Sequence, residues 1–480
     1  MASFYGTTPT LGPRFCSVLA SFAHLPGQPF LDALPEQRLQ QLAEQEGVSF
    51  GNHANSTYTP ALTTWTFLLQ VSSASKCCVA AVARLAVLMT VLQRPVPAAH
   101  TGAYCKARAK LPLRFLQCAT RTLAAEVEDQ APDSWRWYGR RVVLVDGSST
   151  QLPDTEANQA AYPQSSQQQP GLGFPMMRLV VLMAFATAVV LDAAEGPCQG
   201  KESGETALLR TLLGSLRVGD VVVADRHYCS YWQFALLQER GIDVAARLHQ
   251  LRHCDFRRGE RLSRGDTIQT WHKPQRPEWM AEATYACLPE RLRVRLVRVM
   301  VAHPGYRSRK IVVATTLLEA SHYSSVAIGD LYHRRWHVEL DIRSIKQTMK
   351  MEELSCKTPA MACKELWAHL LAYNLVRRVM AAAAWESGKS PRQLSMAGAL
   401  QTLESFRGEL QRVEAGGVEA FALVATILRL LGAHAVGHRP GRVEPRRVKR
   451  RQQKHPLLRQ SRPAARAALM EGRAEGGERS

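Results

Sequence analysis

The sequence predicts an α/β fold in which a strand-rich centre lies between two helical parts. Residues 1 to about 130 repeat apolar positions at helical spacing and show little strand character. From residue 135 to about 248, short runs of β-branched and other apolar residues are bounded by turn-forming residues, as in buried strands. Helical spacing returns after residue 364. With 480 residues, of which 46% are hydrophobic, the chain is long enough for two or three domains.

A helical N-terminal domain is predicted for residues 1–130. Its helices are expected at residues 34–46, 76–92 and 112–127. The basic residues Lys106, Arg108 and Lys110 precede the third helix and are candidates for contact with phosphate. A solvated surface accounts for each of them equally well.

The first part of the predicted core spans residues 131–248 and is expected to be mostly strand. Its strands are expected at residues 142–145, 176–185, 188–191, 221–224 and 244–248. A short helix is expected at residues 204–216, so an antiparallel start of three strands precedes a helix and further strands. Two acidic residues of this part, Asp192 and Glu205, are interpreted as capping or surface groups.

A β-rich insertion is expected at residues 249–309. Residues 292–301 alternate between basic and apolar side chains, which predicts a strand with one cationic face. A further strand is expected at residues 311–315, followed by a helix that begins near Ser324 or Ser325, either of which is a suitable N-cap.

The second part of the core is predicted for residues 310–388, and further helices for residues 389–438. Residues 439–480 form a basic tail that is expected to be extended or disordered. Eleven Lys or Arg and a single Glu occur in residues 439–466, so this stretch carries half of the chain's net charge of +20. We interpret it as a phosphate-binding arm; a solubilising tail is the alternative.

Two apolar runs of the core lead to an aspartate. One run reads R-V-V-L-V-D-G and reaches Asp146, and the other reads D-V-V-V-A-D-R and reaches Asp225. Turn chemistry explains either aspartate alone. Functional groups of open α/β sheets gather at the carboxyl ends of parallel strands, however, so the two together predict a site at one sheet edge.

Four polar residues of the following helix share one face. On an α-helix, Tyr332, Arg335, Glu339 and Lys346 fall within an arc of about 60°. The explanation without a functional role is an exposed helix face with ordinary i,i+4 ion pairs. The functional explanation is a phosphodiester site, because guanidinium and ammonium groups bind phosphate while Glu offers oxygen to Mg²⁺.

Three carboxylates in one cleft would repel each other unless cations were bound. Two divalent ions would keep Asp146, Asp225 and Glu339 ionised and would clamp the attacking and leaving oxygens of a displacement at phosphorus. We therefore predict these three residues to be catalytic ligands of two Mg²⁺ ions, for which Mn²⁺ can substitute. Arg335 and Lys346 are predicted to bind phosphate of the DNA backbone, with Tyr332 adding a phenolic hydrogen bond.

A different metal site is conceivable on the same helix. His333, His337 and Asp341 recur at intervals of four residues and could form a histidine ridge. This ridge would lie at least about 120° from Glu339 on the helix. It lacks the H-E-x-x-H pattern, so it is the weaker hypothesis.

The four-residue stripe resembles the Y-x2-R-x3-E-x6-K signature of DDE transposases of the insertion-sequence-four family of bacterial mobile elements. Other stretches are similar to the same family: G-S-S-T-Q-L-P-D-T after Asp146, N-Q-A-A-Y-P-Q at residues 158–164, and L-L-A-Y-N-L-V-R at residues 370–377. Residues 104–112 also look like its N-terminal segment, so the resemblance covers most of the chain.

The resemblance implies a ribonuclease H-like core and Mg²⁺-dependent cut-and-paste DNA transposition. The implied substrates are the terminal inverted repeats of an insertion sequence and a target DNA, with a homodimer in the DNA complex. Some members of the family stack a flipped base on an aromatic side chain, for which Trp271 and Trp279 are candidates. For either tryptophan alone, ordinary packing is the favoured explanation.

Charge and composition agree with a nucleic-acid partner. A net charge of +20 and a pI near 9.8 favour a polyanion. The sequence shows no secretory signal, and its longest apolar run, residues 179–191, is too short to cross a bilayer. We expect a cytoplasmic bacterial protein that joins the nucleoid when it binds DNA, with no membrane partner. Two alternative functions are a catalytically silent DNA-binding protein of transposase descent and a structure-selective nuclease.

Overall fold

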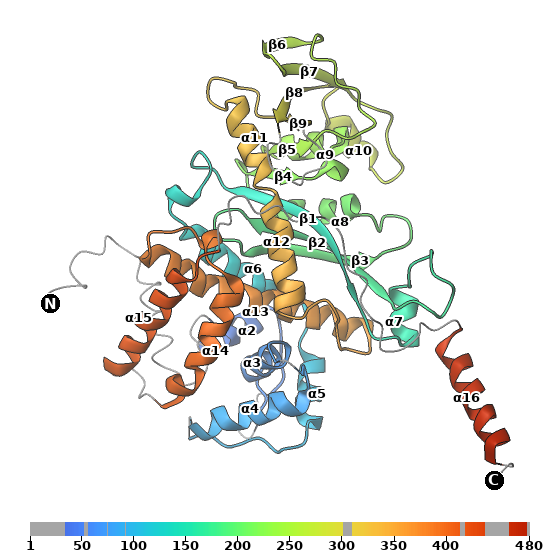
Figure 1. Ribbon diagram of the computed structural model, residues 1–480, viewed down its shortest axis with the longest axis vertical. Helices are drawn as coiled ribbons and strands as arrows, with labels where there is room; N and C mark the ends of the chain where they lie inside the picture. The colour runs from blue at the N-terminus through green and yellow to red at the C-terminus, as the bar shows by residue number, and fades with distance from the viewer. Residues whose placement is uncertain are drawn as a thin grey trace.

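A computed structural model describes residues 34–51, 56–73, 75–91, 93–300, 310–412, 418–436 and 460–477. Nine strands form one mixed sheet in the order β3-β2-β1-β4-β5-β9-β8-β7-β6, and helices cover its faces (Figure 1). The strands are β1 (Val142–Gln151), β2 (Met176–Ala184), β3 (Val190–Pro197), β4 (Val221–Ala224), β5 (Asp243–Arg247), β6 (Glu260–Ser263), β7 (Asp266–His272), β8 (Arg291–Met300) and β9 (Lys310–Thr315).

The first five strands have the ribonuclease H-like order that the sequence predicts. β1, β2 and β3 form an antiparallel meander, while β4 lies parallel to β1 and β5 lies parallel to β4. The short parallel strands are buried on both faces, which explains why β4 reads as an unbroken apolar run. The mixed α/β fold is therefore confirmed.

β1 is longer than predicted and does not stop at Asp146. It continues to Gln151 because β2 pairs with it in antiparallel register over this whole length, and Asp146 lies opposite Val181. Pairing between β1 and β4, by contrast, covers only Val142 to Leu144. Asp146 is therefore interior to one strand pair and beyond the end of the other.

Strands β6 to β8 extend the core sheet and do not form a separate one. β8 pairs with β9, and β9 pairs with β5 at the edge of the ribonuclease H-like strands. Arg295 of β8 is fully buried and makes a two-pronged ion pair with Asp266, at 2.9 and 2.6 Å. It also donates to the carbonyl oxygens of Leu317 and Tyr323. The prediction of a cationic face on this strand is therefore wrong for Arg295. Its buried guanidinium instead connects the extension to the chain that precedes α11.

Helices lie beside both the lower and the upper part of the sheet (Figure 1). The N-terminal group and the helices of the core are α2 (Glu36–Gln45), α3 (Pro60–Val71), α4 (Cys78–Val91), α5 (Gly102–Lys110), α6 (Leu113–Asp129), α7 (Glu156–Ala161), α8 (Glu205–Thr211), α9 (Tyr231–Gln238) and α10 (Glu282–Cys287). The later helices are α11 (Ser325–His333), α12 (Trp336–Arg343), α13 (Pro359–Glu386), α14 (Met396–Arg412), α15 (Val418–Ala433) and α16 (Arg462–Gly477).

Helix α13 is the centre of the helical part. Nearly all of its residues from Ala362 to Ala384 are buried, whichever side of the helix they occupy. It packs on α6, α3 and α15, so it ties the N-terminal helices to the C-terminal ones. Among the described residues no helix combines the length and the apolar character that spanning a membrane requires.

The predicted helix with the four-residue stripe is divided into three parts. Ser324 caps α11, as one of the two predicted N-caps, by accepting a hydrogen bond from the Ala327 N–H at 3.1 Å. α11 ends at His333, and α12 begins at Trp336 after a tighter turn. Residues Ser344–Thr348 then form a wider π-helical turn. The prediction of one continuous α-helical face from Tyr332 to Lys346 is therefore wrong in detail.

Arg108 does not face solvent. Its guanidinium donates to Gln70 Oε1 at 2.6 Å and lies over the rings of Phe67 and Tyr104, at 5.2 and 5.4 Å from their centroids. These contacts hold α5 against α3, so its proposed contact with phosphate is replaced by a packing role. Lys106 and Lys110 of the same helix are exposed.

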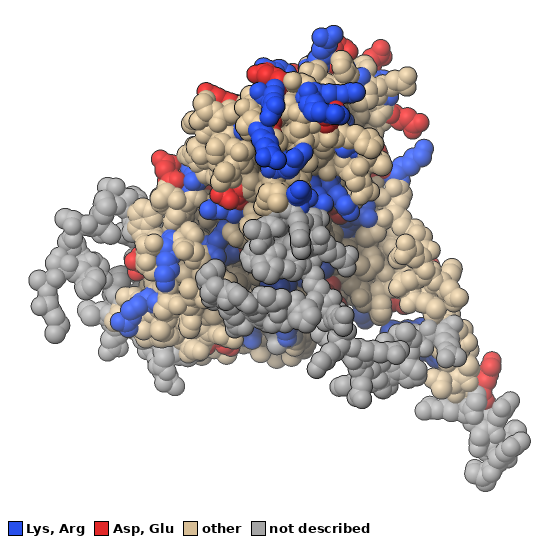
Figure 2. Space-filling view, turned by 45° about the horizontal axis from the view of Figure 1, so that its top comes forward, with Lys and Arg blue, Asp and Glu red and all other residues tan. Residues whose placement is uncertain are grey.

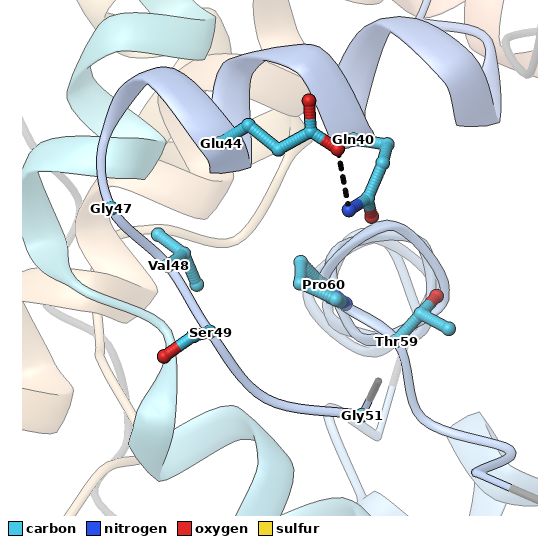
Figure 3. A pocket seen from close by; sticks show the side chains of 8 residues that line it. All are labelled: Gln40, Glu44, Gly47, Val48, Ser49, Gly51, Thr59 and Pro60. Carbon is cyan, nitrogen blue, oxygen red and sulfur yellow. Dashed lines mark hydrogen bonds between the residues drawn. The ribbon is translucent and has the colours of Figure 1, made fainter. Parts of the chain in front are cut away.

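A cavity of about 660 Å³ lies between α2 and the start of α3 (Figure 3). Glu44 is the single charged residue in its lining, and it accepts a hydrogen bond from Gln40. This carboxylate would repel phosphate, so the cavity does not match an anionic partner. The lining residues are Gln40, Glu44, Gly47, Val48, Ser49, Gly51, Thr59 and Pro60.

Residues 439–459 and 478–480 of the predicted basic tail lie outside the described residues. The stretch between them forms α16, which contradicts the expectation of an extended or disordered chain there. Ala is the best helix former, and five alanines within Arg462–Gly477 favour this helix.

Candidate active site

Asp146 is a largely buried carboxylate in the middle of β1. Its side chain is 17% exposed, and its Oδ1 accepts a hydrogen bond from the Gly147 N–H at 3.0 Å. The pKa of Asp146 is raised to about 7, chiefly by burial. Arg335 and the Gly147 N–H act to lower this pKa, while Glu339 and Asp225 act to raise it further. A bound cation would relieve this unfavourable ionisation.

Asp225 follows β4 at the same edge of the sheet. The last residue pair between β1 and β4 is Leu144 with Val223. Asp146 comes two residues after Leu144, and Asp225 comes two residues after Val223. The Asp225 Oδ1 accepts a hydrogen bond from the His227 N–H at 2.7 Å and so caps a short 3-10 turn. Asp225 therefore combines the turn role that is common for aspartate with a place beside Asp146.

Arg335 joins the helix to the strand. Its guanidinium lies 2.5 Å from Glu339 Oε1 and 3.8 Å from Asp146 Oδ2. The Glu339 side chain is 35% exposed, so it reaches the surface above the buried Asp146. Two of the three predicted acids thus share a cation that the sequence assigned to phosphate.

Lys346 and Tyr332 lie on either side of this ion pair. The π-helical turn carries Lys346, whose Nζ donates to the Ser149 carbonyl oxygen of β1 at 2.7 Å. Tyr332 is 8% exposed, and burial raises the pKa of its phenol, against the lowering effect of Arg335. The structure therefore places all four stripe residues along the same edge of the sheet.

The three carboxylates interact electrostatically but do not form a ready-made metal site. Within the described parts of the chain, no three His, Cys, Asp or Glu side chains lie in a group that could hold a metal ion. Their chemistry nevertheless fits a hard divalent cation, because all the donors are carboxylate oxygens and Asp146 is buried. In this structure Arg335 supplies the positive charge between Asp146 and Glu339.

The alternative histidine ridge is wrong. Asp341 is buried and forms ion pairs with Arg377 at 2.7 Å and Arg392 at 2.5 Å. His337 stacks near Phe185, and burial lowers its pKa to about 4. Asp341 is thus committed to two guanidinium groups on the side of α12 that packs against α13 and the chain after it.

Two residues near the site were not identified from the sequence. Arg247 ends β5, one position beyond Ala246, which pairs with the last residue of β4. It is half-buried and acts on the pKa of Tyr332. Glu205, taken from the sequence as a capping or surface group, lies against Gly147. Position is the feature that marks these two residues. Arg247 ends the strand next to Asp225, and Glu205 lies opposite a glycine inside β1.

The two candidate tryptophans have different surroundings. Trp271 is buried, tilted against Phe234 at 5.2 Å, with Arg252 lying over its ring at 4.0 Å. Trp279 is half-buried, and the guanidinium of Arg210 lies 3.7 Å from its ring centroid. Each ring already has one cation on its face, so ordinary packing accounts for both.

Comparison with known proteins indicates the class to which the chain belongs. Residues 137–375 match the family model described as Transposase DDE domain, a range that includes Asp146, Asp225 and Glu339. The chain is thereby placed in the class of DNA transposases.

The chain is 28% identical over 342 residues to the transposase InsG for insertion sequence element IS4 of Escherichia coli (strain K12), covering 70% of this chain and 73% of that protein. It therefore belongs to the DDE transposases of the insertion-sequence-four family. A solved structure of the piggyBac transposase synaptic complex with hairpin DNA matches with a TM-score of 0.38 and 10% identity, covering 89% of this chain and 86% of that one.

Proposed function

We propose that this transposase excises an insertion sequence at its terminal inverted repeats and joins it to target DNA by a metal-dependent cut-and-paste reaction. The observation that carries the proposal is that two acids on neighbouring segments of the sheet lie beside a third acid on a helix. Asp146 and Asp225 lie level with each other beyond the paired part of β1 and β4, and Arg335 links Asp146 to Glu339.

Asp146, Asp225 and Glu339 would hold divalent ions, Mg²⁺ or Mn²⁺. When bound, such ions activate a water or a DNA 3′-hydroxyl and stabilise charge on the leaving oxygen. The chain's own contribution is orientation: β1 and β4 hold two acids on a rigid sheet, and α12 brings the third. The raised pKa of Asp146 supports a site that is completed by added positive charge.

Arg335, Lys346 and Tyr332 would position the DNA backbone. A guanidinium carries five N–H donors, and Arg335 uses its two terminal nitrogens toward carboxylates, so donors remain for a phosphate oxygen. Lys346 stays beside β1 through Ser149, close to the same edge. Arg247, on the other side of Asp225, would add a further cation to this group.

The sheet extension would bind DNA next to the site. Residues 249–300 contain eleven Lys or Arg and six Asp or Glu. Lys and Arg side chains gather on the extension at the top of the molecule (Figure 2). The exposed arginines of this part are Arg257, Arg258, Arg261, Arg264, Arg276, Arg291, Arg293 and Arg298. Recognition of the terminal repeats by residues 1–130, a phosphate-binding arm at residues 439–466 and a homodimer on two DNA ends complete the proposal.

Cleavage of a DNA that carries the element's own inverted repeats tests the proposal. Asp146→Asn, Asp225→Asn and Glu339→Gln are expected to reduce Mg²⁺-dependent cleavage at least about a thousandfold, in line with loss of metal catalysis. DNA binding should persist in all three. Glu352→Gln is the matched control, because Glu352 is exposed shortly after the π-helical turn and should cut normally. Normal cutting by the three site variants would show that the site assignment is wrong.

The same assay separates the alternatives. Cleavage without joining to a target DNA, with metal in excess, would indicate a structure-selective nuclease. Binding to the repeats without any cleavage would indicate a silent DNA-binding protein. Intact acids at all three positions favour the active enzyme over the silent one.

A further inference from the structure

The presence of glycine at residue 147 is explained by a close side chain and not by its backbone conformation. Gly147 follows Asp146 inside β1 and is absent from the described residues with positive φ. Glycine weakens a strand interior, so its presence calls for a close neighbour. A Cβ built on Gly147 would lie 2.6 Å from Oε2 of Glu205 and still closer to the rest of that carboxyl group. The carboxylate of Glu205 therefore occupies the space that any other side chain would fill.

The same carboxylate reaches the chain that follows Asp225. The Tyr228 hydroxyl donates a hydrogen bond to Glu205 Oε2 at 3.3 Å. Tyr228 is 2% exposed, and its N–H donates to the Asp225 carbonyl oxygen.

The backbone on both sides of Glu205 is held by neighbouring elements. Glu205 is the first residue of α8, whose Leu208 and Leu209 are buried against β2 and β3. Arg178 of β2 donates to the Ser203 carbonyl oxygen at 2.7 Å, and Gln233 of α9 donates to that of Thr206 at 3.1 Å. Among the described residues Glu205 forms no ion pair within 4.0 Å, so surface salt bridging does not account for its position.

We propose that Glu205 is a positioning residue that sets the spacing between Asp146 and Asp225. Its carboxylate packs on the residue after the first aspartate and accepts a hydrogen bond from the tyrosine three residues after the second. It thereby connects the two segments across the sheet edge where β1 and β4 cease to pair. The inference rests on the proposed function of the two aspartates.

A double-mutant cycle with the full-length protein tests the proposal. Glu205→Ala is expected to slow cleavage about tenfold at saturating DNA, since a small displacement of catalytic groups has effects of this size or larger. Gly147→Ala should slow it similarly, because the new methyl group displaces the carboxylate. In the Glu205→Ala background, Gly147→Ala should cost less than a further twofold, since the two changes remove the same contact. DNA affinity should not change.

Conservative variants separate positioning from general damage. Glu205→Gln keeps an acceptor for Tyr228 and should restore the cleavage rate to within about threefold of the original, because the hydrogen bond survives. Tyr228→Phe removes only the hydroxyl and should match Glu205→Ala, with no additive effect when the two are combined. The Mn²⁺ concentration for half-maximal cleavage should rise in Glu205→Ala and return in Glu205→Gln. Glu202→Ala, at the exposed neighbour that pairs with Arg210, is the control.

Wild-type cleavage by Glu205→Ala, or additive losses in the cycle, would overturn the proposal. If Asp146→Asn is inactive in the same assay, the proposed function still stands. If Asp146→Asn cuts normally, the proposed function itself fails. Thermal unfolding of each variant identifies any that do not fold, and Tyr228→Phe then decides the question, because it removes a single oxygen atom.

Discussion

The side chain of Arg335 pairs with two acids and also lies where it could bind DNA. It neutralises part of the charge that Asp146 and Glu339 bring together, and it remains within reach of the DNA backbone in the proposed reaction. Lysine at this position could not contact both acids with a planar fork, so Arg335→Lys is not a conservative change here.

Glu128 provides a residue-scale prediction about pH. It is 1% exposed, and burial raises its pKa, against a hydrogen bond from Thr187 at 2.7 Å. A raised folded-state pKa means that the folded protein binds this proton more tightly than the unfolded chain does. Its contribution to stability is therefore complete below the unfolded pKa of about 4.3 and is lost as pH rises through the folded pKa.

The substitution Glu128→Gln removes this pH dependence. The difference in apparent Tm between Glu128→Gln and the original protein should shift in favour of the variant by a few degrees from pH 5 to pH 8, measured by thermal unfolding. Glu44→Gln, at an exposed residue, should give a flat difference. A difference that stays constant or falls with pH would contradict the prediction for Glu128.

At the scale of elements, ion pairs on the side of α12 away from Glu339 hold this helix in place. Asp341, two residues after Glu339, is held by Arg377 of α13 and by Arg392. Arg392 also donates to the Ala184 carbonyl oxygen at the end of β2, at 2.8 Å. A buried network of charges thus connects the helix that carries Glu339 to both the helical part and the sheet.

Without the Asp341 side chain, α12 should be held less firmly against α13 and the sheet. Asp341→Ala removes the carboxylate that pairs with two buried guanidinium groups, and removal of one partner of a buried ion pair costs about 3–5 kcal/mol. We expect a lower apparent Tm and slower cleavage together. Glu36→Ala breaks the exposed pair with Arg94 and should change neither by a measurable amount. An unchanged Tm in Asp341→Ala would show that the network does not stabilise α12.

At the scale of the whole molecule, one continuous sheet joins the site to the basic extension. β5 next to Asp225 pairs with β9, and β9 pairs with β8, so the extension is fixed relative to the two aspartates. DNA bound along the extension would therefore meet the catalytic edge in one defined orientation.

Removing three charges from the extension tests this arrangement. The combined variant Arg257→Ala, Arg261→Ala and Arg264→Ala should weaken binding of terminal-repeat DNA about tenfold at 0.1 M salt and lower the slope of log K against log salt by about 2–3. Arg429→Ala, an exposed residue of α15, is the control. Equal losses in both variants would show that the extension has no special part in binding.

Sequence patterns predicted the elements whose signal is local. β4 appears at the predicted residues, β9 within one residue, and α13 extends at both ends the helix that the apolar pattern of residues 364–385 predicts. The predicted site residues lie along one sheet edge, but their catalytic roles stay predictions, as do the domain boundaries. Predictions failed where partners distant in sequence decide: β2 lengthens β1 past Asp146, and Asp266 buries Arg295.

The sequence by itself determined the α/β class, the two apolar runs that lead to Asp146 and Asp225, and the family signature around Glu339, because each is written in residues close together in the chain. Only the tertiary structure decided that Arg335 lies between two acids, that Asp341 belongs to a buried charge network, and that Glu205 fills the space above Gly147. These contacts join residues far apart in the chain, whose spacing depends on how strands and helices pack, and no local pattern encodes that packing.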